Sequence, residues 1–188
     1  MGAKLLVAVL SALLIAGECK AHHDDGDRQG PRSVVAELMQ IAKDGCFLRG
    51  ADPKRLSIWA EHWHGDAAPT EQLREQNNPF TVLIGGWTLK TGFGAVAVIQ
   101  SAFREPQRGH VCSVTAQLPE AEHHGEAKTA FQRVFATAIA EEKEGPDRHV
   151  DRFWIERGEE PPVRATIDFI PSNRVITIRM IHGSPRPG

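Results

Sequence analysis

Histidine is the residue type in this chain with the widest range of possible chemistry, and the chain contains nine histidines and no tyrosine. Neutral imidazole is the commonest transition-metal ligand, so the spacing of the histidines decides whether a metal site is predicted. The histidines form three pairs and three single positions: His22 and His23, His62 and His64, His123 and His124, and His110, His149 and His182.

The two internal pairs are poorly spaced for metal binding. His62 and His64 end a predicted helix, where residues two apart point about 200° from each other, so they could share a metal only if the helix stopped before His62. His123 and His124 stand beside acidic residues before another predicted helix, a composition typical of a solvated first turn. Because the chain has neither HExxH nor CxxC, the sequence predicts no structural or catalytic metal site there.

The N-terminal pair, His22 and His23, depends on how the chain is processed. Lys4 is followed by thirteen uncharged residues at 5–17, a segment that is too short to span a bilayer and is typical of a secretory signal peptide. We expect cleavage after Ala21, which would leave an amine and two imidazoles that chelate Cu(II). The alternatives are a lipoprotein acylated at Cys19, a retained first helix, and a polar leader that binds no metal.

Export also decides the chemistry of the cysteines. Cys19 leaves with the signal peptide, and Cys46 and Cys112 remain. Two cysteines in an oxidising compartment favour a disulfide, and neither belongs to a redox motif. We therefore predict a Cys46–Cys112 disulfide, and the alternative is two separate buried thiols.

Covalent and acid–base catalysis have little support in the sequence. The chain has no GxSxG motif, and its glycine-rich segments lack the GK[ST] of a phosphate-binding loop. A carboxylate pair for hydrolysis would have to come from residues that are distant in sequence. The candidates for such a pair are Glu61, Asp151, Glu156 and Asp168.

The four tryptophans are the large anchors of the chain. Leu56, Trp59, Ala60 and Trp63 recur at helical spacing, which predicts one apolar face that packs in the core. Trp87 follows two glycines, and Trp154 lies within a predicted strand. These two are candidates for a binding surface, with burial in the core as the alternative.

Hydrophobic periodicity predicts three helices. The first starts near Ser33 and stops at Gly45, and the second is capped by Asp52 with Pro53 in its first turn. The third is a long helix closed by Gly145-Pro146. Its predicted apolar face consists of Phe131, Val134, Phe135, Ala138 and Ile139.

Six segments rich in β-branched and aromatic residues predict strands. Three precede the last helix, at 80–84, 95–103 and 110–118. Three follow it, one at 150–156 and two within 163–183, where Pro171-Ser172-Asn173 supplies the turn of a hairpin. We find no internal repeat. This order predicts an α+β fold with two N-terminal helices and an antiparallel sheet of about six strands in a βββ-α-βββ arrangement, with one disulfide.

The domain organisation predicted from these features is simple. Residues 1–21 form the signal peptide, 22–32 a disordered leader, 33–183 a single α+β domain and 184–188 a loose C-terminal tail. A formal net charge of −2 argues against a nucleic-acid partner, and no segment of the mature chain is apolar enough for a membrane.

The sequence favours a periplasmic or secreted binding protein, such as an inhibitor or immunity-type partner of another exported protein. The alternatives are a secreted hydrolase with a carboxylate or Ser/His site, and a copper-binding periplasmic protein that uses His22 and His23. No other cofactor is predicted. Small size, a disulfide and the lack of a catalytic motif lean against an enzyme.

Overall fold

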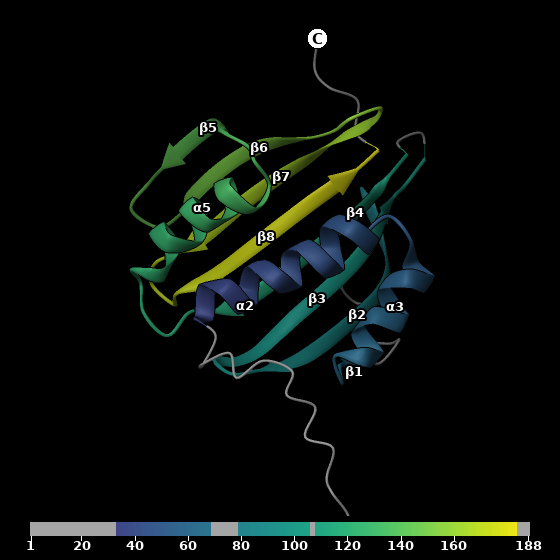
Figure 1. The fold of residues 1–188 in the computed structure, drawn as a ribbon, viewed down its shortest axis with the longest axis horizontal. Helices are drawn as coiled ribbons and strands as arrows, with labels where there is room; N and C mark the ends of the chain where they lie inside the picture. Colours follow the sequence, from purple (N-terminus) through teal and green to yellow (C-terminus); the bar gives the residue numbers. More distant parts are fainter. Residues whose placement is uncertain (1–32, 69–78, 106–107, 184–188) are drawn as a thin grey trace, which may run out of the picture. The chain divides into compact units, whose positions relative to one another are not determined.

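The computed structural model describes residues 33–68, 79–105 and 108–183. The elements in chain order are α2 (Val34–Ile41), the π-helix η1 (Ala42–Phe47), α3 (Pro53–His62), β1 (Asp66–Ala67), β2 (Thr81–Thr91), β3 (Gly94–Phe103), β4 (His110–Gln117), α5 (His123–Val134), β5 (Ile139–Glu144), β6 (His149–Arg157), β7 (Glu160–Ile170) and β8 (Val175–His182) (Figure 1). The α+β class and the antiparallel sheet are confirmed. The described part of the sheet has eight strands, however, and not six. The predicted signal peptide, leader and C-terminal tail lie outside the described residues.

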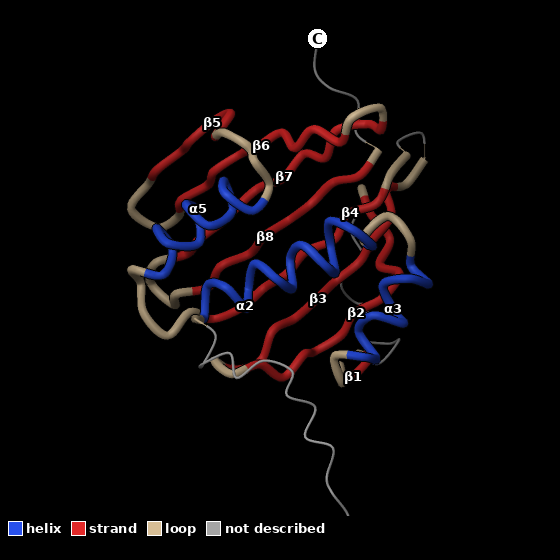
Figure 2. The backbone as a smooth tube through the Cα atoms, viewed as in Figure 1, coloured by secondary structure: helices blue, strands red, loops and turns tan. Residues whose placement is uncertain are grey.

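The sheet consists of two consecutive four-strand meanders. Its strand order is β1-β2-β3-β4-β8-β7-β6-β5, and every neighbouring pair is antiparallel (Figure 2). The last strands of the two meanders, β4 and β8, pair in the middle, with Val114 opposite Ile178. A helix precedes each meander: α3 packs on β2, and Phe131 of α5 lies 4.7 Å from Phe153 of β6 between ring centroids. The topology therefore repeats, although the sequence shows no repeat.

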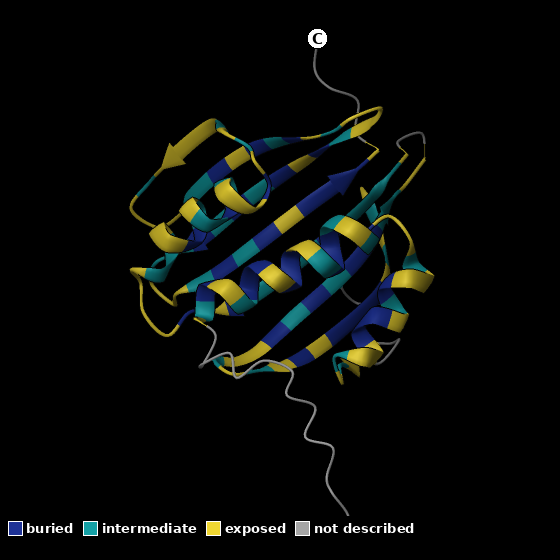
Figure 3. Cartoon of the chain, in the orientation of Figure 1, coloured by how far each residue is buried: buried dark blue, intermediate teal, exposed yellow. Residues whose placement is uncertain are grey.

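The two faces of the sheet have different surroundings. The described α-helices α2, α3 and α5 lie over one face, and buried residues alternate with more exposed ones along the strands β3, β4, β6, β7 and β8 (Figure 3). The buried strand residues pack with the helices in a single core, whose largest side chains include Phe131, Phe153, Leu38 and Met180. No described helix covers the opposite face, which we call the open face.

The sequence predicted that the first helix ends at Gly45, and this prediction is wrong. The chain continues through η1 to a helical Leu48, which Figure 2 shows as one continuous helix with α2. A Cβ atom on Gly45 would lie 2.6 Å from a ring carbon of Trp59. The absent side chain of Gly45 therefore allows two helices to pack closely, and the residue does not mark a helix end. The second helix is as predicted, because the Asp52 carboxylate accepts hydrogen bonds from the N–H groups of Lys54 and Arg55.

The predicted long helix before Gly145 is wrong in its second half. Helix α5 ends at Val134, and Ala136 takes a left-handed conformation with φ of 47° that ends the helical path. Residues 139–144 then form edge strand β5, where Glu141 lies opposite Arg152 of β6. Of the predicted apolar face, Phe131 and Phe135 are buried, whereas Val134 is exposed.

Strand β2 is longer than predicted because it continues through Gly85, Gly86 and Trp87. A bulge between Leu83 and Gly85 shifts the register there. A Cβ atom on Gly85 would lie 2.5 Å from the Trp87 ring, so the absent side chain leaves room for the tryptophan. The glycines that the sequence placed at a strand end thus lie within a strand.

Candidate functional site

A cluster of titratable side chains lies between the start of α5 and the start of β6. His124 of α5 stacks on Phe169 with ring centroids 4.5 Å apart, and its Nε2 lies 3.7 Å from Oδ2 of the buried Asp151. The ring of His149 lies 5.5 Å from that of His124, between ring centroids. Alternation along β6 points His149 and Asp151 toward the helix layer.

Lys128 connects this cluster to the edge strand. Its Nζ forms an ion pair with Glu142 of β5 and lies 3.4 Å from Asp151 Oδ1. The hydrogen bond to Glu142 raises the pKa of Lys128, with a smaller contribution from Asp151. Burial lowers the pKa of His124, although Asp151 opposes this effect. The cluster therefore fastens α5 to β5 and β6 by charge as well as by packing.

The geometry of the cluster does not form a reactive pair. His124 Nε2, His149 Nδ1 and Asp151 Oδ2 are buried without a hydrogen-bond partner among the described residues. The separation of 3.7 Å between His124 and Asp151 is longer than a hydrogen bond. Within residues 33–68, 79–105 and 108–183, no three histidine, cysteine, aspartate or glutamate side chains are placed to hold a metal ion.

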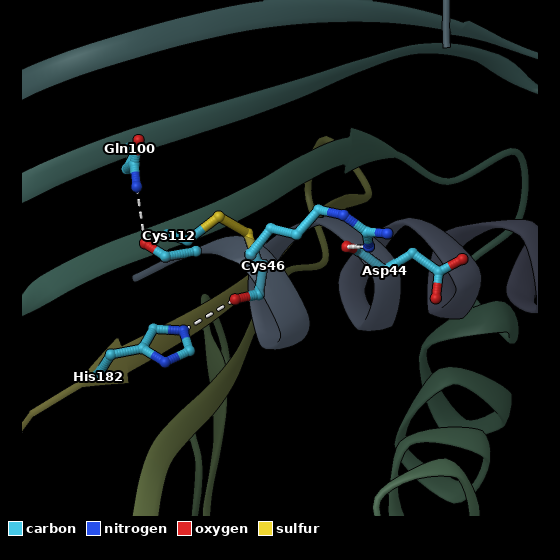
Figure 4. Close-up of a disulfide and its surroundings, with 7 residues drawn as sticks. Asp44, Cys46, Gln100, Cys112 and His182 are labelled. Carbon is cyan, nitrogen blue, oxygen red and sulfur yellow. Dashed lines mark hydrogen bonds between the residues drawn. A yellow bond between two sulfur atoms is a disulfide. The ribbon is translucent and has the colours of Figure 1, made fainter. Parts of the chain in front are cut away.

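A second polar cluster surrounds the disulfide, which is confirmed between Cys46 and Cys112 with Cα atoms 5.2 Å apart (Figure 4). His182 Nε2 lies 2.8 Å from the Cys46 carbonyl oxygen, and the Gln100 side-chain amide donates to the Gly50 carbonyl at 2.7 Å. Burial lowers the pKa of His182, against the effect of its hydrogen bond to Cys46. These contacts join η1 to β4 and β8 and the turn at Gly50 to β3, which is a structural role.

The four carboxylates considered for hydrolysis do not come together. Glu61 lies on α3 and accepts a hydrogen bond from the Ser57 hydroxyl, and Asp151 is buried beneath α5. Glu156 and Asp168 face the other side of the sheet, where Asp168 lies opposite Val150 of β6. Glu156 and Val150 are six residues apart on β6, about 20 Å along a strand. Paired catalytic carboxylates lie about 5–9.5 Å apart, so these two do not form such a pair.

The open face carries a concave site on its C-terminal half. A groove of about 790 Å³ lies over β5, β6, β7 and β8. We call it the arginine groove and define it by six of its lining residues: Arg148, Arg152, Trp154, Arg164, Thr166 and Arg179. Its volume is within the usual range of ligand sites, about 300–1,000 Å³.

Strand register arranges these side chains in two rows across the sheet. One row contains Arg152, Thr166 and Arg179, which lie opposite one another on β6, β7 and β8. The next row contains Trp154 and Arg164, followed by Ile181. The half-buried Trp154 therefore lies directly beside an arginine.

The arginines differ in their partners. Arg148 pairs with Asp168 through two hydrogen bonds, of which the one from Nε measures 2.7 Å, and Arg152 pairs with Glu141. Arg164 and Arg179 are exposed and have no hydrogen bond or ion pair among the described residues. They are diagonal neighbours on adjacent strands, because Thr166 lies opposite Arg179. Two guanidinium groups are thus available to a ligand in one groove.

The structure separates the two tryptophans that the sequence considered for binding. Trp87 is buried on the helix-covered face and belongs to the core. Trp154 lines the arginine groove. Arg152, Arg164 and Arg179 were missed because they lie on three different strands. Each occupies an outward position in an alternating pattern, and that pattern is the signal that could have marked them.

His22 and His23 lie outside the described residues. Among the described residues, no helix is long and apolar enough to cross a membrane.

No protein-family model, curated protein or solved structure matches this chain.

Proposed function

We propose that this chain is an exported, non-catalytic binding protein of the inhibitor or immunity type, and that it holds another exported protein on its open face. The observation that carries the proposal is the arginine groove, which combines a half-buried tryptophan with two exposed arginines that have no ion-pair partner within the described part of the chain. Tryptophan and arginine are the residues most enriched at the energetic centres of protein interfaces.

Export is supported by the N-terminal charge and hydropathy pattern and by the disulfide. A periplasmic or secreted location fits both features. A protein outside the cytoplasm must keep its fold in a variable environment, and a disulfide that closes a long loop raises stability. The open face then remains available for a partner while the helices and the disulfide stabilise the other face.

The alternative of a secreted hydrolase would require reactive groups that converge in a pocket. The described carboxylates considered for this role are dispersed, and the His124–Asp151 contact is longer than a hydrogen bond. The arginine groove offers cations, a hydroxyl and an aromatic ring, which are binding groups, and its carboxylates Asp168 and Glu141 are held in ion pairs with Arg148 and Arg152. These observations favour a binding protein over an enzyme.

The test is affinity capture with the mature protein and an extract of exported proteins from the source cells. The wild-type protein should retain a stoichiometric partner, and the double variant W154A/R164A should lose it. Arg133→Ala is the matched control, because Arg133 is an exposed arginine on α5, on the covered side of the sheet. If no stoichiometric partner is retained, or if the double variant retains it equally well, the proposal fails.

A further inference from the structure

We propose that the partner binds through an acidic polypeptide segment in which a carboxylate stands next to a large apolar side chain. This inference rests on the proposed function and identifies the chemistry of the docking partner. Arg164 and Arg179 would hold the carboxylate, and Trp154 would contact the apolar side chain.

Arg164 and Arg179 are placed so that both can bind the same carboxylate. Diagonal neighbours on adjacent antiparallel strands are about 7–8 Å apart, a distance that two long side chains bridge easily. The planar guanidinium group matches the carboxylate geometry and forms paired hydrogen bonds with it. Arg148 already uses its guanidinium group in this way with Asp168, and Arg152 donates a hydrogen bond to Glu141.

The hydroxyl of Thr166 supports a ligand at the same point. Its Oγ1 atom is buried and has no hydrogen-bond partner among the described residues. Thr166 lies between Arg152 and Arg179 across the strands, so long flexible side chains flank it. A ligand oxygen that draws these side chains aside would give the hydroxyl the acceptor that it lacks.

The apolar part of the segment has its own contacts. Trp154 lies opposite Arg164, and the buried Ile181 lies opposite Arg164 on the other side, where it forms part of the floor of the groove. The indole of Trp154 is half-buried, so its remaining surface is fixed and ready to pack. A residue pair of one acid and one aromatic or aliphatic side chain would match this row.

The mixture of charges in the groove favours a protein over a polyanion. Among the lining residues are the cations Lys143, Arg148, Arg152, Arg164 and Arg179 and the carboxylates Glu141, Asp147 and Asp168. A nucleic acid or a sulfated polysaccharide presents charge uniformly and would meet the three carboxylates. A protein segment can place single acids against the two unpaired arginines and avoid the carboxylates.

A second copy of this chain is a poor occupant. A symmetric dimer uses the same surface patch on both subunits. Pairing through the arginine groove would therefore bring together two surfaces that each have more cations than carboxylates among their lining residues. The repulsion between them argues for a partner of opposite charge.

The experiment uses a phage-displayed library of random twelve-residue peptides, selected on the wild-type mature protein. Enriched peptides should carry aspartate or glutamate next to an aromatic or large aliphatic residue. A peptide chosen from them should bind R164A/R179A at least about tenfold more weakly, because two charge-assisted hydrogen-bonding groups are lost. Its affinity for Arg133→Ala should equal that for the wild-type protein.

The outcomes separate this inference from the proposed function. Enriched peptides without an excess of acids, or peptides that bind R164A/R179A as tightly as the wild-type protein, would overturn the acidic docking segment even if the capture experiment retains a partner. Heparin fragments that bind the groove as tightly as the best peptide would also overturn it, in favour of a polyanion. If no partner is retained by capture, the proposed function itself fails.

Discussion

The Nε2 atom of His182 lies 2.8 Å from the carbonyl oxygen of Cys46 (Figure 4). This contact joins β8, the last strand in the chain, to the π-helical segment that carries the disulfide. Arg157, His110 and Glu160 are the other charged or titratable groups near His182 that affect its pKa. The contact requires a proton on Nε2, and the buried Nδ1 atom has no partner among the described residues.

Stability should fall as pH is lowered below about 6.5. Burial lowers the pKa of His182 and of His124 in the folded protein below their ordinary value of 6.5. The unfolded chain then binds more protons than the folded one between the two pKa values, so the stabilisation is present above pH 6.5 and is lost as pH falls through the folded pKa. The measurement is urea unfolding at pH 7.5, 6.5 and 5.5.

The matched variant for this prediction is His182→Gln, which keeps an N–H donor for the Cys46 carbonyl and does not titrate. Its free energy of unfolding should depend less steeply on pH than that of the wild-type protein, by up to about 1.4 kcal/mol per pH unit. An identical slope for wild type and His182→Gln would show that His182 does not contribute.

The disulfide should contribute about 4 kcal/mol to the free energy of unfolding. Cys46 and Cys112 are 66 residues apart, and the chain-entropy model gives this value for a loop of that length. The double variant C46S/C112S should unfold at correspondingly lower urea concentration, and reduction of the wild-type protein should have a similar effect. Two free thiols found by alkylation of the unreduced, denatured protein would contradict the bond.

Gly50→Ala should destabilise the protein by about 3 kcal/mol or more, the upper end for an overpacked core. A Cβ atom there would lie 2.2 Å from the Cys46 carbonyl oxygen and 2.7 Å from Cys112 Cβ, and neither atom can move freely beside the disulfide. Gly125→Ala is the control, because nothing lies within 4 Å of its added Cβ and alanine favours helix α5 by about 0.5–1 kcal/mol. Equal stability of the two variants in urea would be evidence against the packing described around Gly50.

Trp59→Ala should cost about 3–5 kcal/mol, the usual range for a large buried aromatic residue. Its side chain is buried, contacts Trp63 at 5.7 Å between ring centroids and fills the space left by Gly45. Ile58→Ala, at an exposed position on the same helix, should cost less than about 0.5 kcal/mol. A loss below about 1 kcal/mol for Trp59→Ala would mean that this side chain does not anchor the core.

Local signals in the sequence predicted those parts of the fold that depend on neighbouring residues. The cap at Asp52, the apolar stripe around Trp59 and the last hairpin were all predictable from spacing and turn chemistry. The disulfide followed from counting cysteines. Strand β5 was not predicted, because its polar residues Glu141 and Glu142 find their partners, Arg152 and Lys128, only in the folded chain.

The candidate binding site was not visible in the sequence for the same reason. Arg152, Arg164 and Arg179 lie on separate strands, and only the antiparallel register brings them into one groove. Trp154 was considered for a binding surface from its position alone, without its arginine neighbours. The topological repeat is also invisible in the sequence, because two meanders need only the same pattern of alternation and not the same residues.

The most direct measurement is calorimetric titration of the captured partner into wild-type protein and into Arg164→Ala, Arg179→Ala and Arg133→Ala, each at about 50 and 300 mM salt. The arginine groove predicts one partner per chain, a loss of about tenfold in affinity for each groove variant and none for Arg133→Ala. It also predicts weaker binding at the higher salt concentration for the wild-type protein. Equal affinity of all four proteins for the partner would contradict the open face as the binding site.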